Sequence, residues 1–466
     1  MSKSDAMGGK DPQAIMRGIV ELCADCDTCR FMMDVDCVFF PELYRLWDLE
    51  KEHGESVTDA DLRRLAGLCT FCGLCPCPRI PMDVMDAKSR YVEKKGLSLA
   101  TRMLADVPQL FRWFQISPQL ITTLQSSRVL SPLLRKITGL HPDREFPSFA
   151  EEDFFQWAES HQLTSRSPGI RNVAYFAGCT AGFLFPQIGR ATVLVLQRNG
   201  ISVYTPPQQC CGMPQLVEGD RHGALLRARA NVDQLLDSIQ AGDDLVCSCP
   251  TCGYMMKVLL KERAYYSAAY QHSVGATDDE LKLPVLGVCR HMVLKKSVYK
   301  DILKDDGYFS SLDPMGRIKV AEKFNDVGEY LGRLHAEGRL DTSFSRIDGR
   351  VAYFAPCHQR EQKMGRPYFE LLGLIPGLQI VSLSDTECCG MGGNFGFKAD
   401  FHEHSLTIGR PLFAKIRKVD PQAIITDCMS CRLQFQHVLP YAVFHPLEIL
   451  AQAYQQPPCS LEKMVK

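Results

Sequence analysis

Five cysteines recur in the same order and at nearly the same spacing in two parts of the chain. In each copy, 30 residues separate a lone cysteine from an adjacent pair, and a Cys-x-x-Cys doublet follows after 37 or 38 more. Matching positions are offset by 178 or 179 residues. Chance does not repeat five cysteines at such a register, so we predict a chain built to hold metal twice. The ten cysteines are Cys179, Cys210, Cys211, Cys249 and Cys252 in the first copy and Cys357, Cys388, Cys389, Cys428 and Cys431 in the second.

Length and charge limit the class of protein. At 466 residues the chain exceeds one ordinary hydrophobic core, which indicates two to three domains. The net charge of −1 argues against a nucleic-acid-binding surface as the main function. The first residues are polar, and no run of about 18 apolar residues exists, so we expect a cytoplasmic protein. Thiols stay reduced in that compartment, which favours metal ligands over disulfides.

Strand and helix signals divide the chain into an α-helical part and two α/β repeats. Short apolar runs such as residues 173–177 and 351–355 alternate with helical segments, a pattern that predicts a small parallel sheet in each repeat. The cysteines then fall at the carboxyl ends of strands, where open sheets bind ligands. Helices are predicted at residues 41–52 and 59–68, the second with Thr58 as N-cap. The expected units are a flexible tail (1–12), an α-helical two-cluster ferredoxin module (13–97), a helical connector (98–170), the first repeat with a helical insertion (171–348), the second repeat (349–453) and a tail (454–466).

The ferredoxin module carries eight further cysteines. They are Cys23, Cys26, Cys29 and Cys37, followed by Cys69, Cys72, Cys75 and Cys77. Three cysteines spaced three apart let one loop offer three thiolates to a cubane iron–sulfur cluster, and in two-cluster ferredoxins the fourth ligand comes from the other motif, beside a proline. Because Cys77 precedes Pro78, we assign Cys77 to the first triplet and Cys37 to the second. Structural zinc is the competing interpretation, but two triplets without a paired histidine favour iron–sulfur.

The motif Cys-Cys-Gly at residues 210–212 and 388–390, inside the five-cysteine pattern, resembles the CCG repeat in the B subunit of heterodisulfide reductase. The preceding eight-cysteine module resembles the C subunit of the same enzyme, and their fusion is similar to the D-type heterodisulfide reductase iron–sulfur proteins. The chain also resembles the C subunit of anaerobic glycerol-3-phosphate dehydrogenase and the glycolate oxidase iron–sulfur subunit. Residues 133–140 and 146–150 are similar to the connector of those fused chains.

The resemblance implies a noncubane [4Fe–4S] cluster with five cysteine ligands in each repeat. With two cubanes, the chain would hold four clusters on eighteen cysteines. Of the remaining cysteines, Cys247 is a small buried residue or a spare ligand, and Cys459 has no expected role. Cys289 with His291 is a thiol–imidazole pair or an ordinary core cysteine. His358, directly after a ligand, is a proton donor to a thiolate or a structural histidine.

Residues 107–142 contain four basic residues and no acidic one. Arg112 and Arg128 are two of the four, and Trp113 belongs to an aromatic and apolar surface beside them. A basic amphipathic segment with Trp can lie on an anionic membrane. Docking on a soluble partner protein and packing on the chain's own core are the alternatives.

Four clusters in one chain suggest an electron-transfer function. No flavin or nicotinamide fingerprint appears, so electrons must be exchanged with another subunit. We expect an electron-transfer subunit of an anaerobic or respiratory oxidoreductase, between a flavoprotein dehydrogenase and a quinone or membrane cytochrome, placed in the cytoplasm or on the inner face of the membrane. The alternative is a catalytic subunit that reduces a disulfide substrate at a noncubane cluster. The sequence leaves open the donor, the acceptor, the direction of flow, the oligomeric state and whether the chain itself is catalytic.

Overall fold

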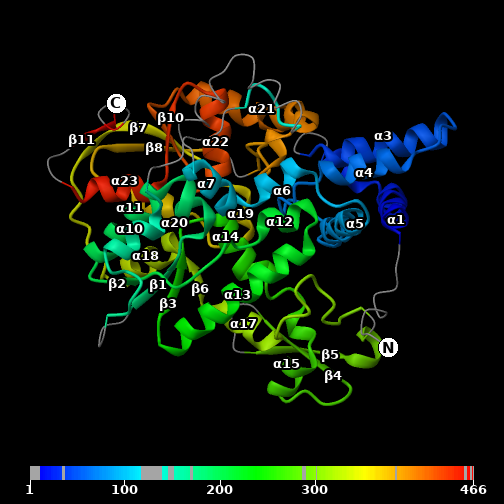
Figure 1. Ribbon diagram of the computed structural model, residues 1–466, viewed down its shortest axis with the longest axis horizontal. Coiled ribbons are helices and arrows are strands. Elements are labelled where there is room, and N and C mark those ends of the chain that lie inside the picture. Colours follow the sequence, from blue (N-terminus) through cyan, green and yellow to red (C-terminus); the bar gives the residue numbers. More distant parts are fainter. Residues whose placement is uncertain are drawn as a thin grey trace.

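A computed structural model describes residues 11–33, 37–116, 139–144, 152–167, 172–285, 290–300, 302–383, 386–455, 459–461 and 464. The fold is mixed α and α/β with small parallel sheets, which confirms the expected fold class. The N-terminal helices lie at one end of the molecule, the two sheets lie at the other, and a small lobe projects below the N-terminal helices (Figure 1). No helix among the described residues is long and apolar enough to cross a membrane.

In the N-terminal part, which we predicted to be a ferredoxin module, the described residues form five helices. They are α1 (Pro12–Cys26), α2 (Thr28–Met32), α3 (Phe39–Glu52), α4 (Asp59–Leu68) and α5 (Arg79–Lys95). Fully buried Leu43, Leu65 and Val84 belong to the core between them. The Thr58 side chain accepts from the backbone N–H of Asp61, and Asp61 caps in return, so the predicted N-cap is confirmed as a capping box. The two predicted helices are confirmed as α3 and α4.

The connector contributes α6 (Leu99–Ala105), α7 (Val107–Ile116) and α10 (Phe154–Ser160). Phe111 of α7 is buried, and its ring lies 5.2 Å from that of Phe183 in the first repeat. At this position the aromatic surface therefore packs on the chain's own core. Residues 117–138 and 145–151, with most of the basic segment and the connector motif, lie outside the described residues.

The first repeat is built on a four-stranded parallel sheet of order β2-β1-β3-β6. Its strands are β1 (Asn172–Phe176), β2 (Ser202–Tyr204), β3 (Asp244–Cys247) and β6 (Phe324–Asp326). Its helices are η1 (Thr180–Leu184), α11 (Pro186–Arg198), α12 (Met213–Glu218), α13 (Arg221–Gln240), α14 (Pro250–Tyr254), η2 (Met255–Leu259) and α18 (Val327–Ala336). The sequence indicated the first three strands, and β6 was missed.

The segment between η2 and β6 is only partly helical, contrary to our expectation of a helical insertion. It contains η3 (Ala264–Tyr266), α15 (Ala268–Ser273), α16 (Lys296–Tyr299) and α17 (Pro314–Lys323). Between α15 and α16 it also forms an antiparallel hairpin of β4 (Glu280–Pro284) and β5 (His291–Lys295). We name residues 264–306 the insertion lobe. Cys289 lies outside the described residues.

The second repeat copies the first, with the strand order β8-β7-β9-β10. Its strands are β7 (Ile347–Tyr353), β8 (Leu378–Ser382), β9 (Ala423–Ile425) and β10 (Ala442–Phe444), and β11 (Cys459–Ser460) pairs with the start of β7. Its helices are α19 (Cys357–Glu361), α20 (Pro367–Leu372), η4 (Phe395–Phe397), η5 (Ala399–Phe401), α21 (His402–Val419), α22 (Met429–Val438) and α23 (Pro446–Ala453). Alternate residues of β1 and β7 belong to one shared hydrophobic core, so the two repeats are packed together.

An ion pair also recurs in both repeats. Lys257, in the helix after the third strand, pairs with Glu329 in the first turn of the helix after the fourth strand. In the second repeat Glu448 has the same place in its helix and pairs with Arg432 at 2.9 Å, although Arg432 stands four residues before the counterpart of Lys257. Each of the two glutamates also completes a capping box. The structural repeat therefore extends through the fourth strand and its helix.

Candidate metal centre

Strand ends position the cysteines of both repeats. Cys179 follows β1 and Cys249 follows β3, while Cys357 and Cys428 stand at the matching ends of β7 and β9. Helices α14 and α22 begin directly after Cys249 and Cys428, so the positive ends of two helices also face the cysteines. Parallel strands place their carboxyl ends at one edge of a sheet, which gathers residues distant in sequence.

The sulfur atoms of each set are close but not bonded. Cys179 Sγ lies 3.3 Å from Cys210 Sγ, and Cys389 Sγ lies 2.9 Å from Cys431 Sγ, whereas a disulfide bond measures about 2.05 Å. A Cβ atom added at Gly178 would approach Cys252 Sγ to 2.8 Å. A glycine is needed there because its backbone, at φ +64°, passes directly beside the sulfur.

All cysteines of the two five-cysteine sets except Cys210 line one cavity of about 180 Å³. The cavity lies between the repeats, and its polar and apolar walls come from the ferredoxin module, the connector and both repeats. The two sets of cysteines therefore face a common space. The cysteines that line it are Cys72, Cys179, Cys211, Cys249, Cys252, Cys357, Cys388, Cys389, Cys428 and Cys431.

The second triplet of the ferredoxin module lies beside a smaller cavity of about 30 Å³. Cys37 lines this cavity together with all three cysteines of the triplet, although about thirty residues separate them. Cys388 of the second repeat lines it as well. Cys72 and Cys388 are therefore shared by both cavities.

The first triplet of cysteines, at residues 23, 26 and 29, lies close to Cys77. Burial, together with the nearby Cys29, Cys77 and Cys26, raises the pKa of the Cys23 thiol to about 12. Cys29, in turn, contributes to the raised pKa of Cys75 in the second triplet. The two triplets are thus close enough to interact electrostatically.

One cysteine of each pair differs from its neighbours in both repeats. The pKa of Cys210 is lowered by its hydrogen bonds with the side chains of Cys179 and Cys211, and the N–H of Gly212 contributes too. The pKa of Cys388 is lowered in the same way by its own neighbours, and the backbone N–H of Gly390 lies 3.3 Å from its sulfur. Hydrogen bonds with neighbouring cysteines, together with burial, raise the pKa values of Cys211, Cys252, Cys389 and Cys431, whereas a hydrogen bond with Cys252 lowers the pKa of Cys249.

This donor set fits iron–sulfur clusters. Crowded, buried thiols are costly to ionise with no cation present, whereas metal ions supply the positive charge that stabilises several thiolates together. Cysteine sulfur is also the usual ligand of such clusters. Backbone N–H groups that point at ligand sulfur, as at Phe39 toward Cys37 at 3.3 Å, raise the reduction potential of a bound cluster.

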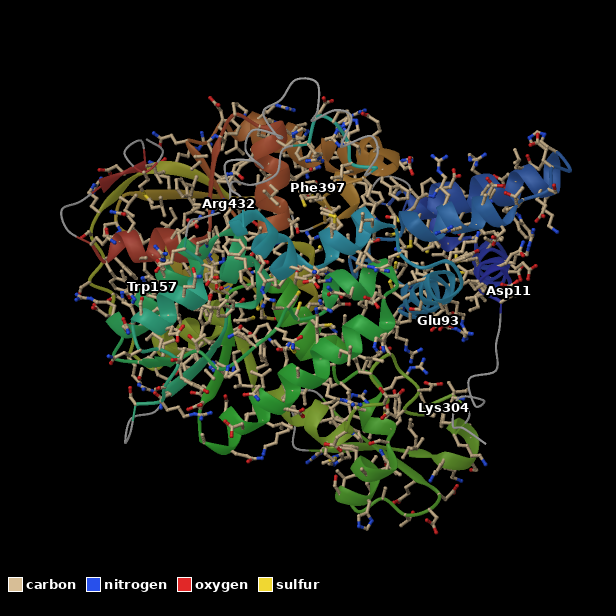
Figure 2. All side chains as sticks on the ribbon, viewed as in Figure 1. Asp11, Glu93, Trp157, Lys304, Phe397 and Arg432 are labelled. Carbon is tan, nitrogen blue, oxygen red and sulfur yellow. The ribbon has the colours of Figure 1, made fainter. Side chains whose placement is uncertain are left out.

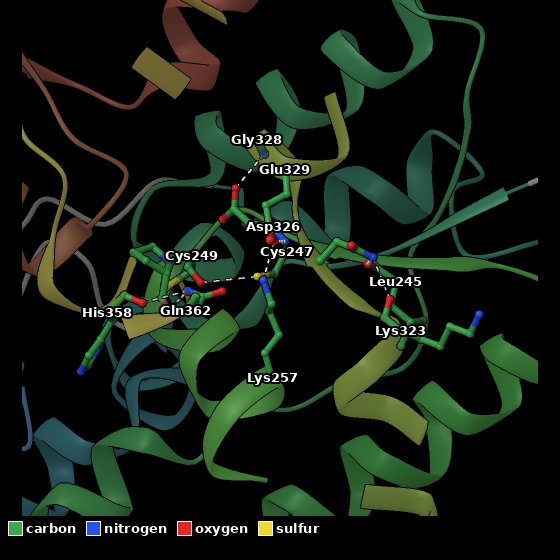
Figure 3. Close-up of polar contacts among 12 residues, drawn as sticks. Leu245, Cys247, Cys249, Lys257, Lys323, Asp326, Gly328, Glu329, His358 and Gln362 are labelled. Carbon is green, nitrogen blue, oxygen red and sulfur yellow. Dashed lines mark hydrogen bonds and ion pairs between the residues drawn. The ribbon is translucent and has the colours of Figure 1, made fainter. Parts of the chain in front are cut away.

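His358 holds three parts of the chain together. Its Nε2–H donates to the Phe71 carbonyl at 3.2 Å, its Nδ1 accepts from the Thr251 hydroxyl at 3.0 Å, and its ring stacks on Tyr254. Gln362, four residues later, donates to the backbone carbonyls of His358 and of Pro250 in α14 (Figure 3). Both ring nitrogens are used in protein contacts, and burial lowers the pKa of the imidazole. This geometry favours the structural role over proton donation.

Cys247 lies in β3 with its side chain fully buried, and its thiol donates to the Cys249 carbonyl at 3.5 Å (Figure 3). On the adjacent strand β6 lies Asp326, opposite Cys247 in the register. One oxygen of Asp326 accepts from the N–H of Gly328, and the other is buried without a hydrogen-bond partner among the described residues. Burial, with the charge of Glu329, raises the pKa of Asp326 to about 7. Sequence analysis missed this acid because β6 itself was missed.

Replacement of Asp326 by asparagine is expected to remove a pH dependence of stability. The carboxyl binds its proton more tightly in the folded chain than in the unfolded chain, so its stabilising contribution is present at low pH and is lost as pH rises through about 7. Between pH 6 and pH 8 this loss is about 1.4 kcal/mol. Anaerobic thermal unfolding of the wild type and Asp326→Asn at both pH values measures it. A variant that loses as much stability as the wild type would contradict this assignment.

Comparison with known proteins agrees with the cysteine pattern. The family model "Cysteine-rich domain" (CCG) matches residues 173–257 and again residues 351–436. The C subunit of the anaerobic glycerol-3-phosphate dehydrogenase of Escherichia coli (strain K12) is 25% identical over 338 residues, which cover 72% of each chain. The B subunit of the fumarate reductase (CoM/CoB) of Methanothermobacter marburgensis is 26% identical over 63% of this chain, which spans 48% of that protein. The resemblance inferred from the sequence is confirmed.

Among solved structures, a hypothetical protein from Helicobacter pylori is similar with a TM-score of 0.42 at 10% identity. The match covers 96% of this chain and 77% of that one. A likeness this weak carries no argument about function.

Proposed function

The chain contains two cysteine-rich CCG domains, and on that premise we propose that it is an iron–sulfur protein that passes electrons between a flavoprotein dehydrogenase and a quinone or cytochrome partner. The observation that carries the proposal is the continuity of the cysteine groups. The first triplet interacts with the second, and Cys72 and Cys388 border both cavities. We propose that the chain works on the cytoplasmic side of the membrane, peripheral to it.

We propose four [4Fe–4S] clusters as the cofactors. One cubane would be held by Cys23, Cys26, Cys29 and Cys77, and the other by Cys37, Cys69, Cys72 and Cys75. Each repeat would hold one noncubane cluster on its five cysteines. Such clusters supply one-electron transfer, and the chain's own residues fix their positions, exclude water from the ligands and donate N–H groups to the sulfurs.

A second candidate function is reduction of a disulfide, which one observation favours. Both five-cysteine sets face a single cavity of about 180 Å³, so a sulfur substrate bound there would contact both repeats. Addition of thiols and disulfides to the oxidised protein tests this candidate. A new paramagnetic signal that disappears in Cys388→Ala or Cys210→Ala would support it, and unchanged spectra across the panel would exclude it.

The test of electron transfer uses the tagged full-length holoprotein, purified anaerobically with its bound partner proteins. We expect a flavoprotein to be retained and to reduce the chain when its own substrate is added. Cys388→Ala is expected to lower electron delivery to a quinone analogue more than about 100-fold. It would remove a direct ligand of the proposed cluster, and loss of a residue that only hydrogen-bonds a ligand already costs about 10–100-fold. Cys247→Ala, which removes a buried thiol outside the five-cysteine set, is the matched control. Normal delivery in Cys388→Ala, or reduction by no flavoprotein, would contradict the proposal.

A further inference from the structure

The insertion lobe carries a concentrated patch of exposed apolar side chains. Of twelve large hydrophobic residues exposed among the described part of the chain, six lie between residues 285 and 302. Every residue from 290 to 300 except Leu294 is exposed. This patch does not belong to the metal sites, since none of its residues lines either cysteine cavity. Its members are Val285, Met292, Val293, Val298, Tyr299 and Ile302.

Positive charge surrounds these apolar side chains. Arg290, Lys295, Lys296 and Lys300 are exposed, and none has an acidic partner within salt-bridge distance among the described residues. Lys304, farther along the same lobe, is paired with Asp306. The lobe therefore presents four free cations next to apolar surface.

Acidic groups at the base of the lobe are already engaged. Asp279 accepts from the backbone N–H of Ser297, and Glu280 lies 3.8 Å from Lys282. Asp305 and Asp306 pair with Arg317 and Arg263, below the patch. Glu280 also stands opposite Lys295 in the hairpin register and Asp278 is exposed, so the lobe is mixed in charge, with its cations gathered on β5 and α16.

The geometry of β5 indicates what covers the patch. Met292 and Val293 are consecutive in the strand, so their side chains point to opposite faces, and they are 48% and 53% exposed. A rigid protein surface covers one face of a hairpin, whereas a lipid interface surrounds both. A second copy of the chain would bring the same four cations together, which charge repulsion disfavours.

We propose that the insertion lobe docks this protein on an anionic lipid surface. The apolar side chains would enter the boundary between headgroups and acyl chains, and the lysines and arginine would contact the lipid phosphates. The lobe projects from the body. Lys304, which belongs to the lobe, lies far from Trp157 and Arg432 in Figure 2. The inference rests on the lobe alone and does not require the proposed electron-transfer function.

The hairpin is held to α15 inside the lobe, and α15 packs on α17 outside it. Gln271 of α15 bonds both the N–H and the carbonyl of Lys282 in β4, at 2.8 and 3.0 Å. Tyr270, the residue before it, packs with Ala264 and Ile318 in a small core of their own. A lipid contact through β5 and α16 would therefore hold the body next to the membrane in a fixed orientation.

Cosedimentation of the full-length holoprotein with vesicles tests the proposal. We expect binding to phosphatidylcholine vesicles that contain about 30% phosphatidylglycerol, weak binding to pure phosphatidylcholine, and a decline with added salt. The triple variant Lys295→Gln, Lys296→Gln, Lys300→Gln should lower the partition coefficient on the order of 100-fold, because each lost charge should lower it about fivefold. The double variant Val298→Ser, Ile302→Ser should lower it more than about tenfold without any change of charge.

A matched control separates a local effect from net charge. Arg410, Arg417 and Lys418 of α21 are equally exposed and lie outside the lobe, so their replacement by glutamine changes the net charge by the same amount. This control should bind vesicles as the wild type does, and all variants should keep the wild-type iron content. If the lobe variants bind vesicles like the wild type, the proposal is wrong. If they instead lose only an acidic protein partner, the lobe is a protein interface and the lipid assignment is also wrong.

Discussion

Gly390→Ala is expected to lower the free energy of unfolding by more than about 3 kcal/mol and to leave the second repeat without its metal centre. Gly390 follows the cysteine pair 388–389 at φ +81°, a conformation that costs other residues about 1–2 kcal/mol. An added Cβ would overlap the carbonyl oxygen of Ser405 and come within 3.0 Å of the N–H nitrogen of Gly409. Both atoms belong to the backbone of α21, which cannot retreat without moving the helix off the repeat.

Gly393→Ala is the matched control for this result. Gly393 lies three residues away at φ +64°, but a Cβ there meets no atom within 4 Å. Its cost should be that of the left-handed backbone alone, about 1–2 kcal/mol. Anaerobic thermal unfolding and iron analysis of both variants measure the difference. Equal losses in the two would show that the close approach of α21 to the cysteine pair is unimportant.

The parts of the fold that were predicted correctly depend on local sequence. The apolar runs before Cys179 and Cys357 are long enough to indicate buried strands, and the polar Thr58 stands where a helix start needs a side-chain acceptor. The order of the four strands in each sheet could not be predicted from the sequence. Strand β6 has three residues, Phe-Asn-Asp, and pairs with β3 across an insertion of about seventy residues, so no local pattern reveals it.

The shared cavity could not be predicted from either repeat alone. It exists because one hydrophobic core joins the two sheets, through residues such as Tyr175 of β1 and Tyr353 of β7. Their alternation shows only that each strand has a buried face. The partner of that face is set by tertiary packing. For the same reason the sequence predicted which cysteines are candidate ligands, but not that Cys388 would lie next to the second triplet.

Paired cysteine variants are expected to reveal how the two cubanes share their ligands. If Cys37 completes the cluster of the second triplet, Cys37→Ser alone should remove one cluster, about four iron atoms per chain. Cys37→Ser combined with Cys69→Ser should then remove no more, because both changes act on the same cluster. Cys37→Ser combined with Cys23→Ser should remove about eight iron atoms, because the changes act on two clusters.

The opposite outcome has an equally definite meaning. If Cys37 served the first triplet, the pair with Cys23 would cost one cluster and the pair with Cys69 would cost two. Iron and acid-labile sulfide analysis of the anaerobic proteins distinguishes the two results without reference to activity. The placement of Cys37 beside Cys69, Cys72 and Cys75 favours the crossed arrangement. In that arrangement each cubane draws ligands from both cysteine groups, so the loss of either group would disable both clusters, and the module could not hold one cluster stably while its other half is unfolded.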